Sequence, residues 1–116
     1  MAWQKLEESK IENLYRGARI RVEVENSIGS VEDTIVDFMV FDSLGSDNVG
    51  LSLVRLTGFK AGHILITFPK ESCPIGTRSL STQWFRENFE STLPLSGSIK
   101  SVWITNERLS VRKRTS

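Results

Sequence analysis

The chain has 116 residues, of which 39% are hydrophobic and 25% are charged, with a formal net charge of +1. This composition is ordinary for a globular domain, and the near-neutral charge argues against binding nucleic acid through an overall positive field. No apolar run reaches membrane-spanning length, and the first residues contain no signal-peptide core. We therefore expect a soluble cytoplasmic protein with a single domain over 1–116, a core at 16–105 and a loosely ordered basic tail at 106–116.

The N-terminal part contains one clear strand pattern. Residues 3–16 fit no regular period well. In residues 18–25, the apolar residues from Ala18 to Val24 alternate with charged ones, which is typical of a half-buried strand. We expect this strand to have an apolar inner face and a charged outer face.

Residues 34–68 contain three apolar runs, at 34–41, 49–56 and 63–68. The first is apolar on both faces except at Asp37, a pattern typical of a central strand that is covered on both sides. In the second run the alternation slips between Leu51/Leu53 and Val54/Leu56, which predicts a β-bulge. The connection between the second and third runs is short and has glycine at each end, so we predict a three-stranded antiparallel meander.

A helix of about three turns is expected after the meander. Pro69 ends the third strand, and Ser81 or Thr82 can cap the helix. The helix is expected to bury an apolar stripe that consists of Phe85, Phe89 and Leu93, with Trp84 beside it.

A final strand at 98–105 places Val102 and Ile104 on one face and Ile99 and Trp103 on the other. The resulting order is β-β-β-β-α-β. We predict an α+β fold, a mostly antiparallel sheet with one main helix packed on a face. The residues expected to pack together are Ile20, Val22, Val36, Phe38, Val40, Ile64, Ile66, Phe85 and Phe89.

The sequence offers no constellation of residues for catalysis or metal binding. His63 is the only histidine, and no Ser, Cys or Asp is spaced to pair with it. Cys73 is the only cysteine, so no internal disulfide forms, and no basic neighbour activates its thiol. Asp37 lies in an apolar strand, so we expect a structural partner such as lysine, arginine or a turn amide. We expect no enzymatic activity, no cofactor and no metal; a small-ligand site around His63 and Asp37 is an alternative.

Four residues are candidates for contact with a partner protein. Trp3 lies outside the clear elements and is the best candidate for an exposed anchor, because tryptophan is enriched at interface hot spots. Lys60 lies between the second and third strands of the meander, and Lys70 and Glu71 directly follow the third. Rigid strands hold such loops in fixed positions, so these charges predict an interaction rim.

Short motifs between residues 58 and 88 resemble a bacterial immunity-protein family. The motifs are Gly58-Phe59-Lys60-Ala61-Gly62, the Pro69-Lys70-Glu71 after a strand, and Ser81-Thr82-Gln83-Trp84 leading to Asn88. This family is number forty-five of those predicted from polymorphic-toxin gene clusters, and the likeness spans residues 16–104. The resemblance implies a small, mostly β domain. Members of the family carry a second tryptophan after the position of Asn88, where this chain has Phe89.

The resemblance implies a protein that is made beside a toxin, binds it in the cytoplasm and neutralises it by stoichiometric contact. It implies no catalytic residue. An alternative is a small regulatory or nucleic-acid-binding protein that uses the basic tail, whose cations are Arg108, Arg112, Lys113 and Arg114. Steeply salt-dependent binding of DNA or RNA would mark that alternative. The sequence gives no reason to prefer a monomer or a dimer.

Overall fold

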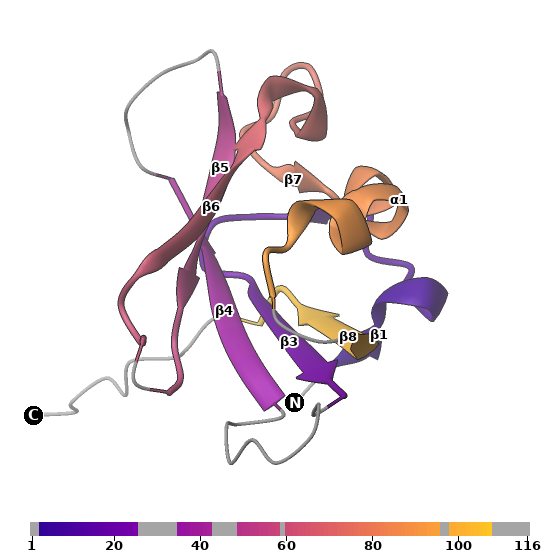
Figure 1. Cartoon of the computed structure of the whole chain (residues 1–116). Coiled ribbons are helices and arrows are strands. Elements are labelled where there is room, and N and C mark those ends of the chain that lie inside the picture. Colours follow the sequence, from indigo (N-terminus) through magenta and orange to yellow (C-terminus); the bar gives the residue numbers. More distant parts are fainter. Residues whose placement is uncertain (1–2, 26–34, 43–48, 59, 96–97, 108–116) are drawn as a thin grey trace, which may run out of the picture.

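The computed structural model describes residues 3–25, 35–42, 49–58, 60–95 and 98–107. Within these residues a six-stranded sheet has the order β1-β8-β3-β4-β5-β6, and β2 and β7 form a second sheet (Figure 1). All paired strands are antiparallel. The strands are β1 (Gln4–Lys5), β2 (Asn13–Leu14), β3 (Arg19–Val24), β4 (Ile35–Phe41), β5 (Val49–Arg55), β6 (Ile64–Pro69), β7 (Leu80–Ser81) and β8 (Ile99–Thr105).

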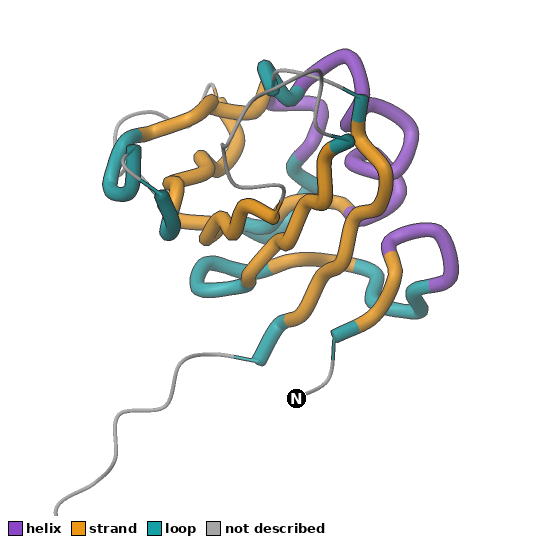
Figure 2. Tube along the Cα trace, turned by 60° about the horizontal axis from the view of Figure 1, so that its bottom comes forward, coloured by secondary structure: helices purple, strands orange, loops and turns teal. Residues whose placement is uncertain are grey.

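The helices of the described residues lie on one side of the large sheet (Figure 2). They are α1 (Thr82–Thr92) and two 3₁₀ helices, η1 (Leu6–Glu8) and η2 (Lys70–Ser72). Helix α1 packs on the sheet through Phe85, whose ring meets that of Phe68 on β6 edge to face, with the centroids 5.9 Å apart. The predicted α+β fold and the meander of β4, β5 and β6 are confirmed.

Helix α1 begins where the sequence predicts. The side chain of Ser81 accepts a hydrogen bond from the backbone N–H of Trp84 over 3.2 Å, which satisfies one of the free amides of the first turn. In the predicted apolar stripe, Phe85 and Leu93 are buried and Phe89 packs partly buried against the core.

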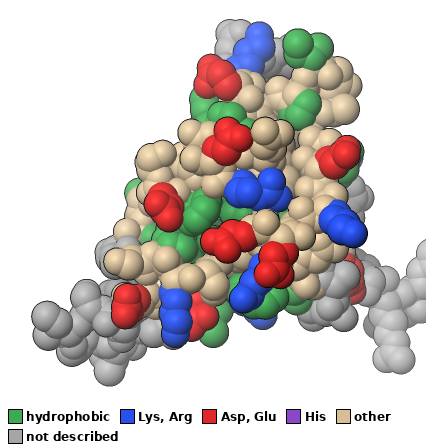
Figure 3. All heavy atoms as spheres, turned by 90° about the vertical axis from the view of Figure 1, so that its right-hand side faces the viewer, with side chains coloured by type: hydrophobic (Ala, Val, Ile, Leu, Met, Phe, Trp, Pro, Cys, Tyr) green, Lys and Arg blue, Asp and Glu red, His purple; other side chains and the backbone are tan. Residues whose placement is uncertain are grey.

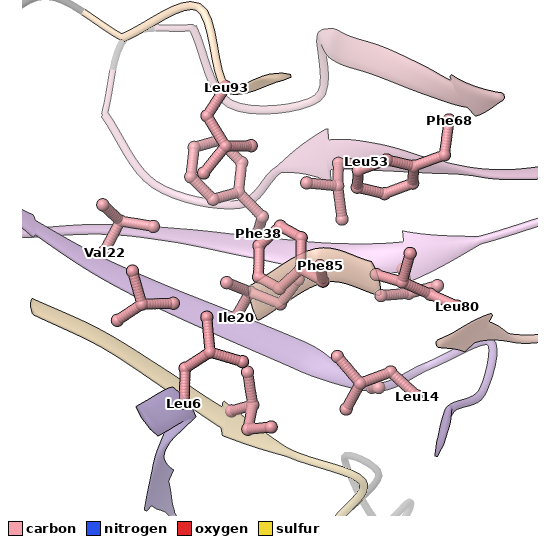
Figure 4. Close-up of a cluster of buried hydrophobic side chains, with 14 of the residues drawn as sticks. Leu6, Leu14, Ile20, Val22, Phe38, Leu53, Phe68, Leu80, Phe85 and Leu93 are labelled. Atoms are coloured by element: carbon pink, nitrogen blue, oxygen red, sulfur yellow. The ribbon is translucent and has the colours of Figure 1, made fainter. Parts of the chain in front are cut away.

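The core lies between the helices and the inner face of the sheet (Figure 4). Six residues of the predicted set are buried there: Ile20, Val22, Val36, Phe38, Val40 and Phe85. Ile66 and Phe89 are partly buried against them. Leu6 and Leu14 are also fully buried, so the segment 3–16, which showed no clear period, supplies part of the core.

The prediction that Ile64 joins the core is wrong, because this residue is 60% exposed. Strands β5 and β6 shift register between Leu53 and Val54: Leu53 pairs with Ile66, but Val54 pairs with Ile64. A shift of one residue moves a side chain to the other face of a sheet. The register shift lies between Leu53 and Val54, where the alternation of the second run slips, but the extra residue, Leu65, is on β6, and it turns Ile64 outward.

A second register shift reverses the prediction for Ile99. The sequence predicts that Ile99 shares a face with Trp103, but Ile99 packs against the core. Strands β3 and β8 shift register after Glu23, which pairs with Ser101, so that Val24 pairs with Ile99. The skipped residue changes the side on which Ile99 lies.

Strand β4 is central, as predicted, but it is covered on one side only. Val36, Phe38 and Val40 are buried beneath α1 and its neighbours, whereas Ile35 on the other face is 50% exposed. No helix or strand within the described residues covers this outer face. The part of the chain that the structure describes therefore covers β4 on one side only, in contrast to the expectation of cover on both sides.

The N-terminal segment is held along the sheet edge by side-chain hydrogen bonds. The guanidinium of Arg86 on α1 donates to the carbonyl oxygens of Leu6, over 2.9 Å, and Ser9, over 3.2 Å. Ser9 Oγ also donates to the side chain of Gln4 over 2.8 Å. These bonds connect the segment to α1, and the pairing of β1 with β8 holds the residues next to Trp3.

Candidate functional site

The outer face of the large sheet collects large side chains that no described element covers. We call it the open face. Its position follows from the register, since the residues that alternate with the buried ones must point outward. It comprises Trp3, Lys5, Arg19, Arg21, Glu23, Ile35, Asp37, Met39, Val54, Ile64, Ser101 and Trp103.

Aromatic rings and cations are stacked on the open face. The ring centroid of Trp3 lies 4.6 Å from Cζ of Arg21 and 5.4 Å from Cζ of Arg19. Nζ of Lys5 lies 5.4 Å from the ring centroid of Trp103. Trp103 pairs in the ladder with Arg21 on one side and Lys5 on the other. Cation–π attraction therefore holds both half-buried indoles in place.

The centre of the open face is fixed by an ion pair between neighbouring strands. Arg21 donates from Nε to Oδ1 of Asp37 over 2.8 Å and from Nη2 to Oδ2 over 2.9 Å. The arginine partner expected for Asp37 is thus confirmed. The hydrogen bond to Asp37 raises the pKa of Arg21 further above its usual value, so the group remains a cation.

An apolar row continues the open face toward β6. Met39, Val54 and Ile64 are consecutive partners across β4, β5 and β6, and Arg19 pairs with Met39 on β3. Ile64 and Ile35 are both at least half exposed. Aromatic, arginine and exposed aliphatic side chains on one rigid face are typical of a protein interface.

The four predicted contact residues lie in three separate places. Lys60 is exposed in the turn that precedes β6, whereas Lys70 and Glu71 are exposed in η2 at the other end of that strand. The six residues of β6 separate the two ends by about 20 Å. Trp3 precedes β1, at the opposite edge of the sheet from β6. The structure therefore does not bring these residues together.

The residues considered for chemistry are not assembled into a site. Both carboxylate oxygens of Asp37 bind Arg21, and His63 is exposed just before β6. Cys73 donates from Sγ to the carbonyl oxygen of Thr77 over 2.9 Å. A pocket of about 120 Å³ beside β8 is lined by neither His63 nor Asp37. In the described parts of the chain, no three His, Cys, Asp or Glu side chains are grouped to hold a metal ion.

The comparison with protein families identifies the chain. The sequence model of the family described as immunity protein 45 matches residues 7–104. The chain belongs to the immunity protein 45 family. The resemblance seen in the motifs between residues 58 and 88 is thereby confirmed. No curated protein and no solved structure matches the chain.

Two groups of residues discussed above lie outside residues 7–104, which the family model matches. Trp3 and Lys5, which supply one ring and one cation of the open face, precede the matched residues. The basic residues behind the nucleic-acid alternative lie at 108–116, outside the described residues. None of the helices that the structure describes is long and apolar enough to cross a membrane.

Sequence reasoning assigned no contact role to Arg21, Lys5 or Trp103. The signal that could have found Arg21 is the charged outer side of residues 18–25, which predicts where its side chain points. The pairing of β8 with both β1 and β3 brings the three residues together, and no local pattern encodes this pairing.

Proposed function

We propose that this family member binds a cognate bacterial toxin through its open face and neutralises it as a stoichiometric complex in the cytoplasm. Membership in an immunity protein family supports a toxin as the partner. The observation that carries the choice of surface is the pair of cation–π contacts on an uncovered sheet face, Arg21 against Trp3 and Lys5 against Trp103. The protein acts as a binding surface, with no chemical step of its own.

The open face has the properties of a tight-binding surface. Tryptophan and arginine dominate interface hot spots. Here the Trp3 ring is held by two guanidinium groups, and Arg21 is held by Asp37, so little side-chain freedom remains to be lost on binding. This face carries three cations, Lys5, Arg19 and Arg21, and two carboxylates, those of Glu23 and Asp37. A toxin surface with an acidic rim and an apolar centre complements this arrangement.

The charged loops remain predicted contacts at the margin of the interface. Charges at an interface rim mainly change the association rate. The substitutions Lys60→Glu and Glu71→Lys test the two ends of β6 separately. We expect each to slow association with the toxin while leaving the fold intact. Unchanged association in both variants would remove the loops from the interface.

The proposal is tested with the toxin that is encoded beside the gene. Coexpression with the active toxin should restore growth of cells that the toxin alone kills. Calorimetric titration with a catalytically inactivated toxin should give an equimolar complex. Absence of both results rejects toxin neutralisation. The double variant Trp3→Ala and Trp103→Ala tests the surface. If this variant is folded and binds the toxin as the wild type does, the open face is not the binding surface, but toxin neutralisation is not rejected.

A further inference from the structure

A groove runs along the edge of β8, on the side where β1 lies. Its first part is the pocket of about 120 Å³, which lies between η1, α1 and β8. A second hollow of about 300 Å³ shares Glu90 and Ile99 with the first and extends past Leu93 and Leu95. We call the two together the edge groove. Figure 3 shows hydrophobic side chains between acidic and basic ones on this side of the molecule.

The edge groove lies beside a stretch of β8 with no neighbouring strand on that side. Strand β1 pairs only with Trp103 and Ile104, and the chain then leaves the ladder in the turn of η1. Within the described residues, no strand pairs with Ile99–Val102 on this side. These four consecutive residues all line the first pocket, although Ile99 and Val102 lie on the core side of the sheet and Ser101 lies on the open face. The groove therefore contacts the edge of the strand and not one of its faces.

The direction of the backbone groups of Val102 follows from the ladder. The N–H of Val40 on β4 donates to the carbonyl of Ala18, so Ala18 and every second residue after it direct their backbone groups to β4. The residues between them, Arg21 among them, direct theirs to β8, where the partner of Arg21 is Trp103. Val102 alternates with Trp103 and so directs its N–H and C=O to the side of β1 and the groove.

The groove has apolar side chains in a mostly polar lining, and its rim carries charges of both signs. Leu6, Phe89 and Ile99 supply the apolar lining. The rim carries two cations that are already engaged. Lys100 pairs with Glu23 over 3.7 Å, and Lys5 stacks on Trp103.

The two rim carboxylates, those of Glu7 and Glu90, have no ion-pair or hydrogen-bond partner among the described residues. An extended segment with apolar and basic side chains matches this combination of an unpaired strand edge, apolar side chains and two carboxylates without partners in the described part of the chain.

We propose that the edge groove takes an extended segment of the toxin, rich in apolar and basic residues, which adds a strand to the sheet beside Ile99–Val102. This inference rests on the proposed function. The edge groove is continuous with the open face, because Lys5 and Ser101 belong to both. One partner can therefore contact the open face and extend a segment into the groove.

The test uses the full chain and the catalytically inactivated toxin encoded beside its gene. The first measurement is hydrogen exchange of the free protein and of the complex. We expect exchange of the backbone amides in 99–102 to slow on complex formation. The second is the affinity of the double variant Glu7→Lys and Glu90→Lys. We expect it to fall about tenfold or more, because the variant places cations where basic side chains bind.

A matched control is Glu87→Lys. Glu87 is exposed on the same helix as Glu90 but does not line the groove. We expect this variant to bind the toxin as the wild type does. If amide exchange in 99–102 is unchanged, or if the double variant binds as tightly as the control, the proposal that a toxin segment binds in the edge groove is wrong. Binding of the toxin elsewhere on the protein is not affected by that result. Failure to form any complex overturns both the groove proposal and the proposed function.

Discussion

Arg21 on β3 and Asp37 on β4 are partners on neighbouring strands, and their side chains share two charge-assisted hydrogen bonds, of 2.8 and 2.9 Å, on the same face of the sheet. Their side chains are 40% and 19% exposed. Surface ion pairs contribute little on average, but a bidentate pair held between two strands has the most favourable geometry. The same arginine lies against Trp3, so the pair also orients the aromatic part of the open face.

Replacing Asp37 with asparagine should lower the free energy of unfolding by about 1 kcal/mol. The pKa of Arg21 is raised in the folded state. Its stabilising contribution is therefore complete below the usual arginine pKa and is lost only as pH rises through the higher folded value. Urea unfolding at about pH 6 and about pH 9 should give the same difference between wild type and variant. A difference that vanishes at the higher pH would contradict this assignment.

Replacing Trp3 with alanine should weaken toxin binding by about 30-fold or more, as expected for a hot-spot tryptophan. The free energy of unfolding should fall by only about 1 kcal/mol, since Trp3 contributes cation–π contacts on the surface. Calorimetric titration and urea unfolding give the two quantities.

Trp84 provides the matched control for Trp3. It lies on the covered side of the sheet, where its ring meets that of Phe68 with centroids 5.9 Å apart. The substitution Trp84→Phe should cost about 1 kcal/mol of stability through imperfect packing and leave toxin affinity unchanged. A Trp3→Ala variant that binds the toxin as tightly as Trp84→Phe would rule out Trp3 as an anchor.

Replacing Arg86 with methionine should release the N-terminal segment from α1. The change removes the hydrogen bonds to the carbonyl oxygens of Leu6 and Ser9, and each bond from a charged donor contributes about 1.5–3 kcal/mol. Amide exchange in residues 4–9 should become faster, and toxin affinity should fall because Trp3 loses its position. The substitution Glu87→Gln, at an exposed site on the same helix, should change neither. Unchanged exchange in Arg86→Met would show that other contacts hold the segment.

Replacing Gly50 with alanine should destabilise the fold. A Cβ atom there would lie 2.6 Å from Ser72 Oγ and 2.9 Å from the carbonyl oxygen of Pro69, closer than atoms can pack. Overpacking of this kind costs about 1–3 kcal/mol, which urea unfolding will detect. Adding Ser72→Ala should recover part of the loss, since the contact with Pro69 remains. Full stability of the Gly50→Ala single variant would contradict the close approach of η2 to β5.

Much of the fold could be predicted because each element carries its own period. The alternation in residues 18–25 specifies which side chains of β3 are buried, and helical spacing specifies the inner face of α1. The serine cap at Ser81 marks the start of the helix through a local hydrogen bond. These signals depend on neighbours within a few residues, so a single sequence is sufficient to detect them.

The errors arise where the register between strands changes. Ile64 was predicted to be buried, and Ile99 was predicted to lie on the face of Trp103, yet the bulges in β5–β6 and β3–β8 move both residues to the other side. The sequence predicted the first bulge in β5 between Leu53 and Val54, but the extra residue is Leu65 on β6. A bulge is a property of a pair of strands, so the alternation within one strand cannot locate its effect on the other.

The sequence by itself determined the in-and-out pattern of β3, the start and inner face of the helix, and the immunity-protein character of residues 58–88. Only the tertiary structure showed which residues come together in the candidate site. Trp3 meets Arg21 because β8 lies between β1 and β3, and Arg21 meets Asp37 because β4 lies on the other side of β3. Those neighbours are chosen by the packing of the whole sheet against α1 and the N-terminal segment. Local periodicity specifies which face a residue occupies, but contacts between distant strands specify which residues share that face.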